Sequence, residues 1–202
     1  MLNFAHYKSQ KAIKQLLILS LLVLLGCKTN KGANSFAVHE KQIKSGDLIF
    51  RRSYGLISDI IVARLDDNEQ ALSHCGIAHR DSANKLYVIH ALPLKLSKTD
   101  GMQICSFADF VSDCRPGTLK VTRFLPDTSG TIESWALRYL GASIPFDAHF
   151  DTSDSTAFFC TELPLHIIES QFQLHLVNKD SDAIPTFSIF FQPDYFEEIE
   201  LY

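Results

Sequence analysis

The sequence predicts an α+β fold. Hydrophobic residues make up 46% of the 202-residue chain and charged residues 21%, a balance that allows one buried core and excludes long disorder and a polytopic membrane protein. Short segments with the alternation typical of strands follow one another, and a few helical segments lie between them. Runs of strands with a few helices are typical of α+β domains.

The first half of the chain contains one predicted helix among strands. We expect strands over residues 47–51, 74–79 and 85–90, and a helix over about 55–65. Ser53 can cap this helix, whose apolar side chains share one face. Residues 81–84 read Asp-Ser-Ala-Asn, which suits a hairpin between the second and third strands.

The second half mixes short elements with polar loops. Residues 92–105 are ambiguous, because Asp100-Gly101 interrupts them. Ser106 and Asp109 form a capping-box pattern that predicts a short helix ending near Ser112. The later predictions are a strand over 119–124, helices over 131–140 and 158–170, and a strand over 186–191.

The N-terminus has the features of an export signal. Three lysines within residues 1–14 precede a Leu-rich run over 16–25, which is shorter than the roughly 20 residues that span a bilayer. Gly26-Cys27 follows, and the segment resembles a bacterial lipobox, in which small residues precede a cysteine that is lipidated. An ordinary signal peptide or an uncleaved anchor is the alternative.

These features divide the chain into three parts. We expect residues 1–26 to be a lipoprotein signal peptide, 27–40 a lipidated cysteine with a polar tether, and 41–202 a catalytic domain. This division predicts a membrane-anchored lipoprotein of the bacterial cell envelope, on the periplasmic side or in the outer membrane. Without the three leader lysines the body keeps 16 basic and 23 acidic residues, a net charge of −7, which argues against nucleic-acid binding.

Several reaction classes lack their motifs. The chain has no G-x-S-x-G elbow, no phosphate-binding glycine loop, no G-x-G-x-x-G and no C-x-x-C. His74 and His79 are five residues apart on one predicted strand, so their side chains face opposite sides. We therefore expect no metal and no cofactor.

A cysteine and two histidines form the candidate catalytic set. Cys160 lies where a helix begins, and the N-terminus of a helix favours a thiolate. His74 begins a strand and His90 interrupts the apolar residues of the next strand. Cys160 could attack an acyl carbon while His74 moves the proton and His90 orients His74. Spacing alone leaves open that Cys160 is a core residue and that the histidines are only hydrogen-bonded.

Five segments in order carry a resemblance to a known family. They are Ser45-Gly-Asp-Leu-Ile-Phe50, Ser73-His-Cys-Gly-Ile77, Tyr87-Val-Ile-His-Ala91, Ile144-Pro-Phe-Asp147 with Phe150, and Phe158-Phe-Cys-Thr-Glu-Leu163. Together they resemble the YiiX-like group of the NlpC/P60 superfamily, which are circularly permuted papain-like cysteine hydrolases. The resemblance covers about residues 44–169 and implies a permuted papain-like fold with an antiparallel sheet packed against helices.

The resemblance also implies roles for single residues. Cys160 matches the nucleophile, His74 the base and His90 the third polar position, where the group often has glutamate. A histidine at position 90 orients the imidazole of His74 but brings no negative charge. Pro164 follows Cys160 closely and removes one backbone donor, so it can shift where the helix begins.

Three acidic residues lie in the matched motifs. We expect Asp47 to be a turn residue and Asp147 to fix a loop by hydrogen bonds rather than to act as a catalytic acid. Glu162 is either structural or faces the substrate.

The predicted function is cysteine-dependent hydrolysis of an amide bond, in peptides or cell-wall fragments. A lipid-directed acyltransferase or thioesterase is the alternative enzyme, and a non-catalytic envelope binding module is the alternative from another class. The predicted partners are a peptide, cell-wall or lipid-like small substrate and a membrane, and we expect a monomer. Cys160 must stay unpaired to act, whereas Cys105 and Cys114 could form a disulfide if their Cα atoms come within about 7 Å.

Replacement of the lipobox cysteine tests the anchor. Cys27→Ala should move the protein from the membrane fraction to soluble or unprocessed fractions, because no thiol is left to carry lipid. Fractionation and intact-mass measurement check this expectation. A mature protein whose mass includes no acyl chains would contradict the lipoprotein assignment.

Overall fold

The computed structural model describes residues 39–65, 67, 69–152, 154–177 and 184–201. Cys27 and the predicted signal peptide therefore lie outside the described residues, as does nearly all of the tether. Among the helices of the described ranges, none has the length and apolarity needed to cross a bilayer.

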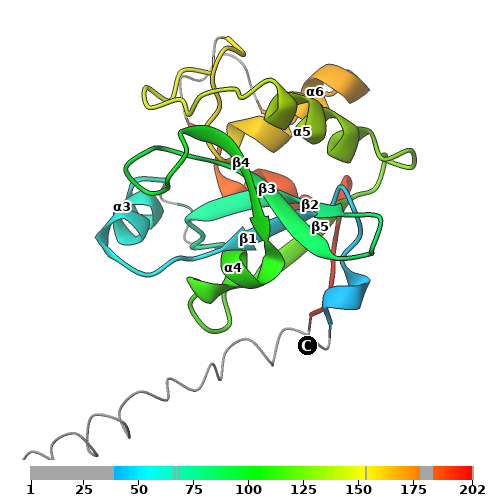
Figure 1. The fold of residues 1–202 in the computed structure, drawn as a ribbon, viewed down its shortest axis with the longest axis horizontal. Helices are drawn as coiled ribbons and strands as arrows, with labels where there is room; N and C mark the ends of the chain where they lie inside the picture. Colours follow the sequence, from blue (N-terminus) through cyan, green and yellow to red (C-terminus); the bar gives the residue numbers. More distant parts are fainter. Residues whose placement is uncertain (1–38, 66, 68, 153, 178–183, 202) are drawn as a thin grey trace, which may run out of the picture.

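The described part of the chain folds around one sheet of six strands (Figure 1). The order across the sheet is β4-β3-β2-β1-β5-β6, and every neighbouring pair is antiparallel. The strands are β1 (Leu48–Arg51), β2 (His74–Arg80), β3 (Leu86–Leu92), β4 (Gly101–Ser106), β5 (Lys120–Phe124) and β6 (Phe196–Glu198). The α+β architecture predicted from the sequence is thus confirmed.

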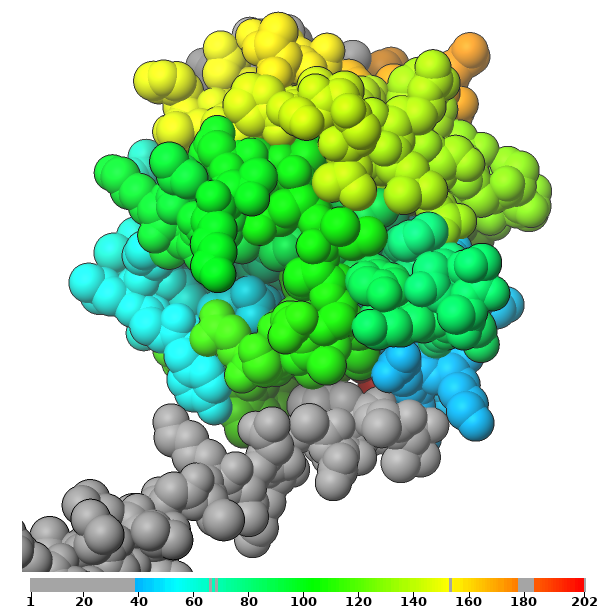
Figure 2. Space-filling view, viewed as in Figure 1, coloured from blue at the N-terminus to red at the C-terminus, as the bar shows by residue number. Residues whose placement is uncertain are grey.

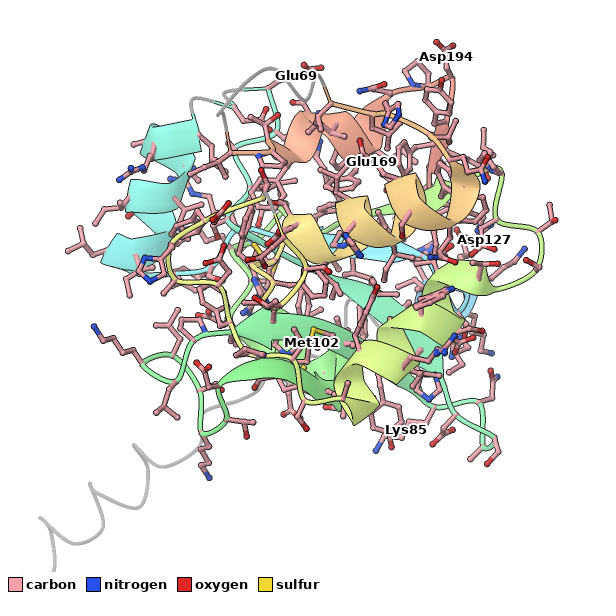
Figure 3. The ribbon with its side chains drawn as sticks, turned by 90° about the horizontal axis from the view of Figure 1, so that it is seen from above. Glu69, Lys85, Met102, Asp127, Glu169 and Asp194 are labelled. Atoms are coloured by element: carbon pink, nitrogen blue, oxygen red, sulfur yellow. The ribbon has the colours of Figure 1, made fainter. Side chains whose placement is uncertain are left out.

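Helices cover the two faces of the sheet unequally. The helices α5 (Thr131–Gly141) and α6 (Glu162–Phe172) lie together on one face, as Figures 1 and 3 show. The short α4 (Phe107–Ser112) lies on the other face (Figure 1). The larger core cluster lies under α5 and α6, and the smaller one lies under α4. The helix α3 (Leu56–Leu65) lies at one side of the sheet (Figure 1).

The pairing of β2 with β3 leaves no room for a side chain at Gly76. A Cβ atom there would lie 2.5 Å from Cγ1 of Val88 and 2.8 Å from the carbonyl oxygen of Ile89. Real Cβ atoms do not approach other atoms so closely, so the glycine permits the close approach of the two strands. This approach brings the side chains of His74 and His90 to the same face.

The structure corrects two expectations and adds elements that the sequence did not predict. The predicted strand at 186–191 is wrong, because these residues form a 3-10 helix, η2 (Phe187–Phe191), that packs its phenylalanines into the core. Strand β6 and the 3-10 helix η1 (Glu40–Gln42) were not expected. The ambiguous residues 92–105 form a loop followed by β4, and α6 begins at Glu162 rather than at 158.

The apolar residues of α3 were expected to share one face, and three of them are exposed to solvent. Leu56, Ile57 and Ile60 are exposed, with Leu56 at 74%. The first half of α3 therefore presents an apolar surface to solvent.

Candidate active site

Two of the three predicted site residues are in direct contact. Nε2 of His74 lies 2.8 Å from Nδ1 of His90, and both rings are buried. His74 is the first residue of β2, and His90 lies on the adjacent β3. His79, farther along β2, instead contacts Glu133 of α5, so the expected opposite orientation of His74 and His79 is confirmed.

The surroundings of the two histidines keep both rings neutral. Phe110 of α4 packs against both rings, with centroids 5.6 Å apart in each case. Burial lowers the pKa of His74 well below its usual value, and the nearby His90 and Arg51 act in the same direction. Burial, together with the charge of Arg51, lowers the pKa of His90 to about 3. A neutral His74 can accept a proton, as a general base must.

The tautomer of the pair decides which nitrogen of His74 is free. In the described part of the chain, Nδ1 of His74 has no hydrogen-bond partner, and Nε2 of His90 is buried without one. If His74 donates from Nε2 to Nδ1 of His90, then Nδ1 of His74 keeps its lone pair. In this tautomer His90 orients His74 and leaves it a basic nitrogen.

Cys160 lies in the turn that opens α6. The carboxyl group of Glu162 accepts a hydrogen bond from the backbone N–H of Phe159 at 3.2 Å, and the N–H of Leu163 bonds to the carbonyl of Phe159 at 3.2 Å. Pro164 lies within the first helical turn, where its missing N–H would have no intrahelical partner. The proline therefore explains why the regular helix starts later than the sequence pattern predicts.

The backbone of Cys160 is held against the neighbour of His74. The thiol of Cys75 donates a hydrogen bond to the carbonyl oxygen of Cys160 at 3.0 Å. Hydrogen bonding from the Cys75 side chain is the largest cause that lowers the pKa of Cys160, and backbone N–H groups of Cys75, Thr161 and Cys160 add to it. Burial opposes this effect, but the net direction favours the thiolate.

Cys160, the third predicted residue, is not hydrogen-bonded to His74 or His90 in the described part of the chain. Over the described residues, no hydrogen bond joins the sulfur of Cys160 to either imidazole. Cys160 contacts Cys75, which follows His74 on β2 but points to the opposite face, so Cys160 lies on the α5 and α6 face and the imidazole pair lies on the α4 face, against Phe110. Hydrogen bonds of a catalytic site are often long before substrate binds and become shorter in the complex.

The acidic residues of the matched motifs have structural contacts. Asp147 accepts hydrogen bonds from the backbone N–H groups of His149 at 2.7 Å and Asp151 at 2.6 Å, so its expected role in fixing the loop is confirmed. Asp47 accepts a turn hydrogen bond from Lys44 N–H at 2.7 Å, and Arg123 binds both of its oxygens at 2.8 Å. The expected turn is thus present, with an ion pair that was not expected.

Glu162 is the acidic residue nearest to Cys160 in sequence. Burial raises the pKa of Glu162 to about 8, and the charges of Asp147, Asp154 and Asp151 act in the same direction. At neutral pH its carboxyl group is therefore mostly protonated. Its bond to Phe159 N–H assigns it a structural role in the turn that carries Cys160.

Exposed apolar side chains lie on three segments around this site, and we call them the apolar rim. They are Leu56, Ile57 and Ile60 of α3, Leu94 and Leu96 of the β3–β4 loop, and Phe150. In Figure 2 the β3–β4 loop (green) lies between α3 (cyan) and the segment around residue 150 (yellow).

Each segment of the apolar rim is fixed next to a site residue. Ser58 of α3 hydrogen-bonds Ser73, the neighbour of His74, at 2.8 Å. The β3–β4 loop begins three residues after His90. The ring of Phe150 packs on Phe159, the neighbour of Cys160, with centroids 5.2 Å apart.

Sequence reasoning missed Cys75 and Arg51. Cys75 was counted only among the cysteines, although its position beside His74 was visible in the motif. The guanidinium of Arg51 stacks on Phe110, 4.7 Å from the ring centroid, and donates to the Phe110 carbonyl at 2.7 Å. A single arginine at the end of a strand gives no signal that it will face two histidines.

The four cysteines of the described residues are free thiols. Cys160 is unpaired, as a nucleophile requires. Cys105 and Cys114 do not form the disulfide that their spacing allowed. Both contribute to the smaller core cluster under α4.

Comparison with solved structures identifies a similar fold. The crystal structure of the metalloprotein YiiX from Escherichia coli O157:H7 matches with a TM-score of 0.53 and 22% sequence identity, over 68% of this chain and 71% of that chain. No protein-family model matches the chain, and no curated protein sequence matches it significantly. The chain therefore has a YiiX-like fold.

That neighbour is a metalloprotein. In the ranges that the structure describes, no three His, Cys, Asp or Glu side chains converge in a way that could hold a metal ion. His74 and His90 are two nitrogen ligands that bond each other. The described residues thus do not fit a metal centre.

The raised pKa of Glu162 predicts how the stability of the fold depends on pH. Its pKa is about 8 when folded and near its usual 4.5 when unfolded, so between these values the unfolded state loses the proton first. The free energy of unfolding should fall as pH rises, by up to about 1.4 kcal/mol per pH unit. Glu162→Gln keeps an acceptor for Phe159 N–H and should remove this slope.

Urea unfolding of both proteins between pH 5 and about pH 8 measures the difference. Glu169→Gln is the matched control, since it replaces a carboxylate of the same helix that accepts from Leu176 N–H at 2.9 Å. Equal slopes for the wild type and Glu162→Gln would contradict a buried, protonated Glu162.

Proposed function

We propose that this protein is a cysteine-dependent hydrolase that cleaves an amide bond in a peptide or cell-wall fragment, through Cys160, His74 and His90. The observation that carries the proposal is the buried His74–His90 pair, whose Nε2–Nδ1 contact leaves Nδ1 of His74 without a partner in the described chain. The permuted papain-like connectivity, in which the base precedes the nucleophile, belongs to the same proposal. So does the lipid anchor at Cys27 in the bacterial envelope.

Each residue has a distinct role in the proposed reaction. The reaction requires a movement of the start of α6 that brings Cys160 to Nδ1 of neutral His74. Nδ1 then takes the proton from the Cys160 thiol, and the thiolate attacks the acyl carbon. Backbone N–H groups at the start of α6, that of Cys160 among them, can stabilise the oxyanion. His74 then gives its proton to the leaving amine, and water releases the acyl group in the second half-reaction.

The neutrality of the histidines affects how the thiolate is stabilised. A protonated imidazole beside a nucleophilic cysteine would stabilise the thiolate. The lowered pKa of His74 instead favours a neutral imidazole in the free protein. Hydrogen bonding by Cys75 and the backbone N–H groups replaces that contribution to the thiolate.

Lipid-directed acyl transfer or thioester hydrolysis is the second candidate function. The apolar rim favours it, because its exposed side chains lie on segments fixed next to each of the three site residues. Contiguous exposed apolar side chains are typical of surfaces that bind lipids or other apolar ligands. A non-catalytic binding module fits one observation, namely that no imidazole hydrogen-bonds the Cys160 sulfur within the described chain.

Alkylation of the thiols at mild pH, together with substitution of Cys160 and His74, tests the catalytic assignment. Iodoacetamide should label Cys160 before Cys75, Cys105 and Cys114, since burial raises the pKa of each of the other three thiols. Cys160→Ala and His74→Ala should each reduce turnover of a peptide anilide or an ester by roughly 10²–10⁴-fold with little loss of folding. The double variant should lose no more than either single one.

Variants at position 90 distinguish the role of His90, which orients the imidazole, from the role of His74, which transfers the proton. His90→Ala should reduce turnover less than His74→Ala, and His90→Glu should keep activity, because a carboxylate also orients the imidazole. The new negative charge should raise the pKa of His74 and move the acidic limb of kcat/KM to higher pH. His79→Ala is the matched control on the other face of β2. Equal labelling of all four cysteines, with full activity in His74→Ala, would exclude the catalytic assignment.

The dependence of turnover on acyl-chain length distinguishes an amide hydrolase from a lipid-directed enzyme. Leu94→Ser with Leu96→Ser should lower turnover of a palmitoyl ester at least about tenfold more than that of a butyryl ester if the rim binds acyl chains. Leu125→Ser is the control, since Leu125 is similarly exposed but follows β5. Equal effects on both esters would favour the amide hydrolase over the lipid-directed enzyme.

A further inference from the structure

A second thiol lies beside the candidate nucleophile, and the proposed reaction does not consume it. Cys75 occupies β2 between His74 and Gly76 and is 1% exposed. Its sulfur donates to the carbonyl oxygen of Cys160 at 3.0 Å. The strand and the helix start thus hold the thiol of Cys75 against the backbone of Cys160, although the two residues are 85 positions apart in sequence.

The two thiols differ in their ionisation. The pKa of Cys75 is raised well above its usual value, mainly because the side chain is buried, and its hydrogen bond to Cys160 adds to this. The pKa of Cys160 is lowered, with the Cys75 side chain as the largest cause. Cys160 is therefore the more acidic thiol of the pair, and Cys75 is the one that holds its proton more firmly. A thiolate is the form that peroxides oxidise.

We propose that Cys75 is a resolving cysteine, and that hydrogen peroxide reversibly closes the site by forming a Cys75–Cys160 disulfide. The inference rests on the proposed function only through the reactivity of Cys160. It does not depend on which bond the enzyme cleaves.

The chemistry takes two steps. The Cys160 thiolate attacks one oxygen of hydrogen peroxide, so an S–O bond forms and the O–O bond breaks, which gives sulfenic acid and hydroxide. The sulfur loses two electrons and the peroxide gains them. The Cys75 sulfur then attacks the Cys160 sulfur, so that an S–S bond forms, the S–O bond breaks and water leaves with the thiol proton.

The other two thiols of the described chain are poorly placed to compete. Cys105 and Cys114 belong to the core cluster under α4, whereas Cys75 belongs to the cluster under α5 and α6, against which Cys160 packs. Burial raises the pKa of Cys105 to about 11. The thiol of Cys114 contacts the hydroxyl of Thr118 at 3.5 Å.

Peroxide treatment of the purified protein tests the inference. A non-reducing digest analysed by mass spectrometry should contain a linked pair of peptides from residues 75 and 160, lighter by about 2 Da than the two thiol peptides, since two hydrogens leave. Iodoacetamide labelling of Cys160 should be lost and should return after dithiothreitol. In Cys75→Ser, peroxide should instead drive Cys160 to sulfinic and sulfonic acid, which dithiothreitol does not reverse.

Two further variants make the outcome decisive. Cys114→Ser should form the linked peptide like the wild type, and Cys75→Ala replaces Cys75→Ser if circular dichroism shows that the serine variant is unfolded. Irreversible oxidation of Cys160 in the wild type at the rate seen without Cys75, or a bridge to Cys105 or Cys114, would overturn the inference. A 75–160 bridge in a protein without hydrolytic activity would uphold it and count against the proposed function instead.

Discussion

The close pairing of β2 with β3 is the constraint on which the candidate site depends. Gly76 opposes His90 across the pair, and its missing side chain lets the two strands approach. His74 lies two residues before Gly76, so it points to the same face as His90, and the two rings meet at 2.8 Å. Cys75 points to the other face and contacts Cys160. This segment of β2 therefore carries the imidazole pair on one face and the contact to Cys160 on the other.

Burial then determines which protons the site holds. The imidazoles are enclosed by Phe110 and lie near the charge of Arg51, which disfavours a second positive charge. A neutral His–His pair differs from the pair of imidazole and carboxylate that a glutamate at position 90 would give. Without a carboxylate, nothing in the described surroundings offsets the cost of charging His74 in the resting state. A hydrogen-bond donor near the sulfur is therefore more important here than an adjacent imidazolium.

The sequence predicts local elements better than their ends and their partners. The strands with β-type alternation, the capping box at Ser106 and the alternation of His74 and His79 follow from local rules, and the structure contains them. Residues 186–191 were predicted as a strand because Thr-Phe-Ser-Ile-Phe-Phe has high β-propensity. Packing of Phe187 and Phe190 on Phe50 decides otherwise. The contact of Cys75 with Cys160 joins distant residues, and no local rule predicts it.

The position of Cys75 links activation of the nucleophile to its protection. A neutral thiol that hydrogen-bonds a thiolate makes that thiolate more available at neutral pH, and a more available thiolate is also more easily oxidised. Cys75, which makes Cys160 easier to oxidise, is also the cysteine that lies against Cys160. A serine at this position could stabilise the thiolate by the same hydrogen bond, but it could not form the bridge that stops oxidation at a reversible stage. Cysteine at position 75 can do both, which a serine or an alanine cannot.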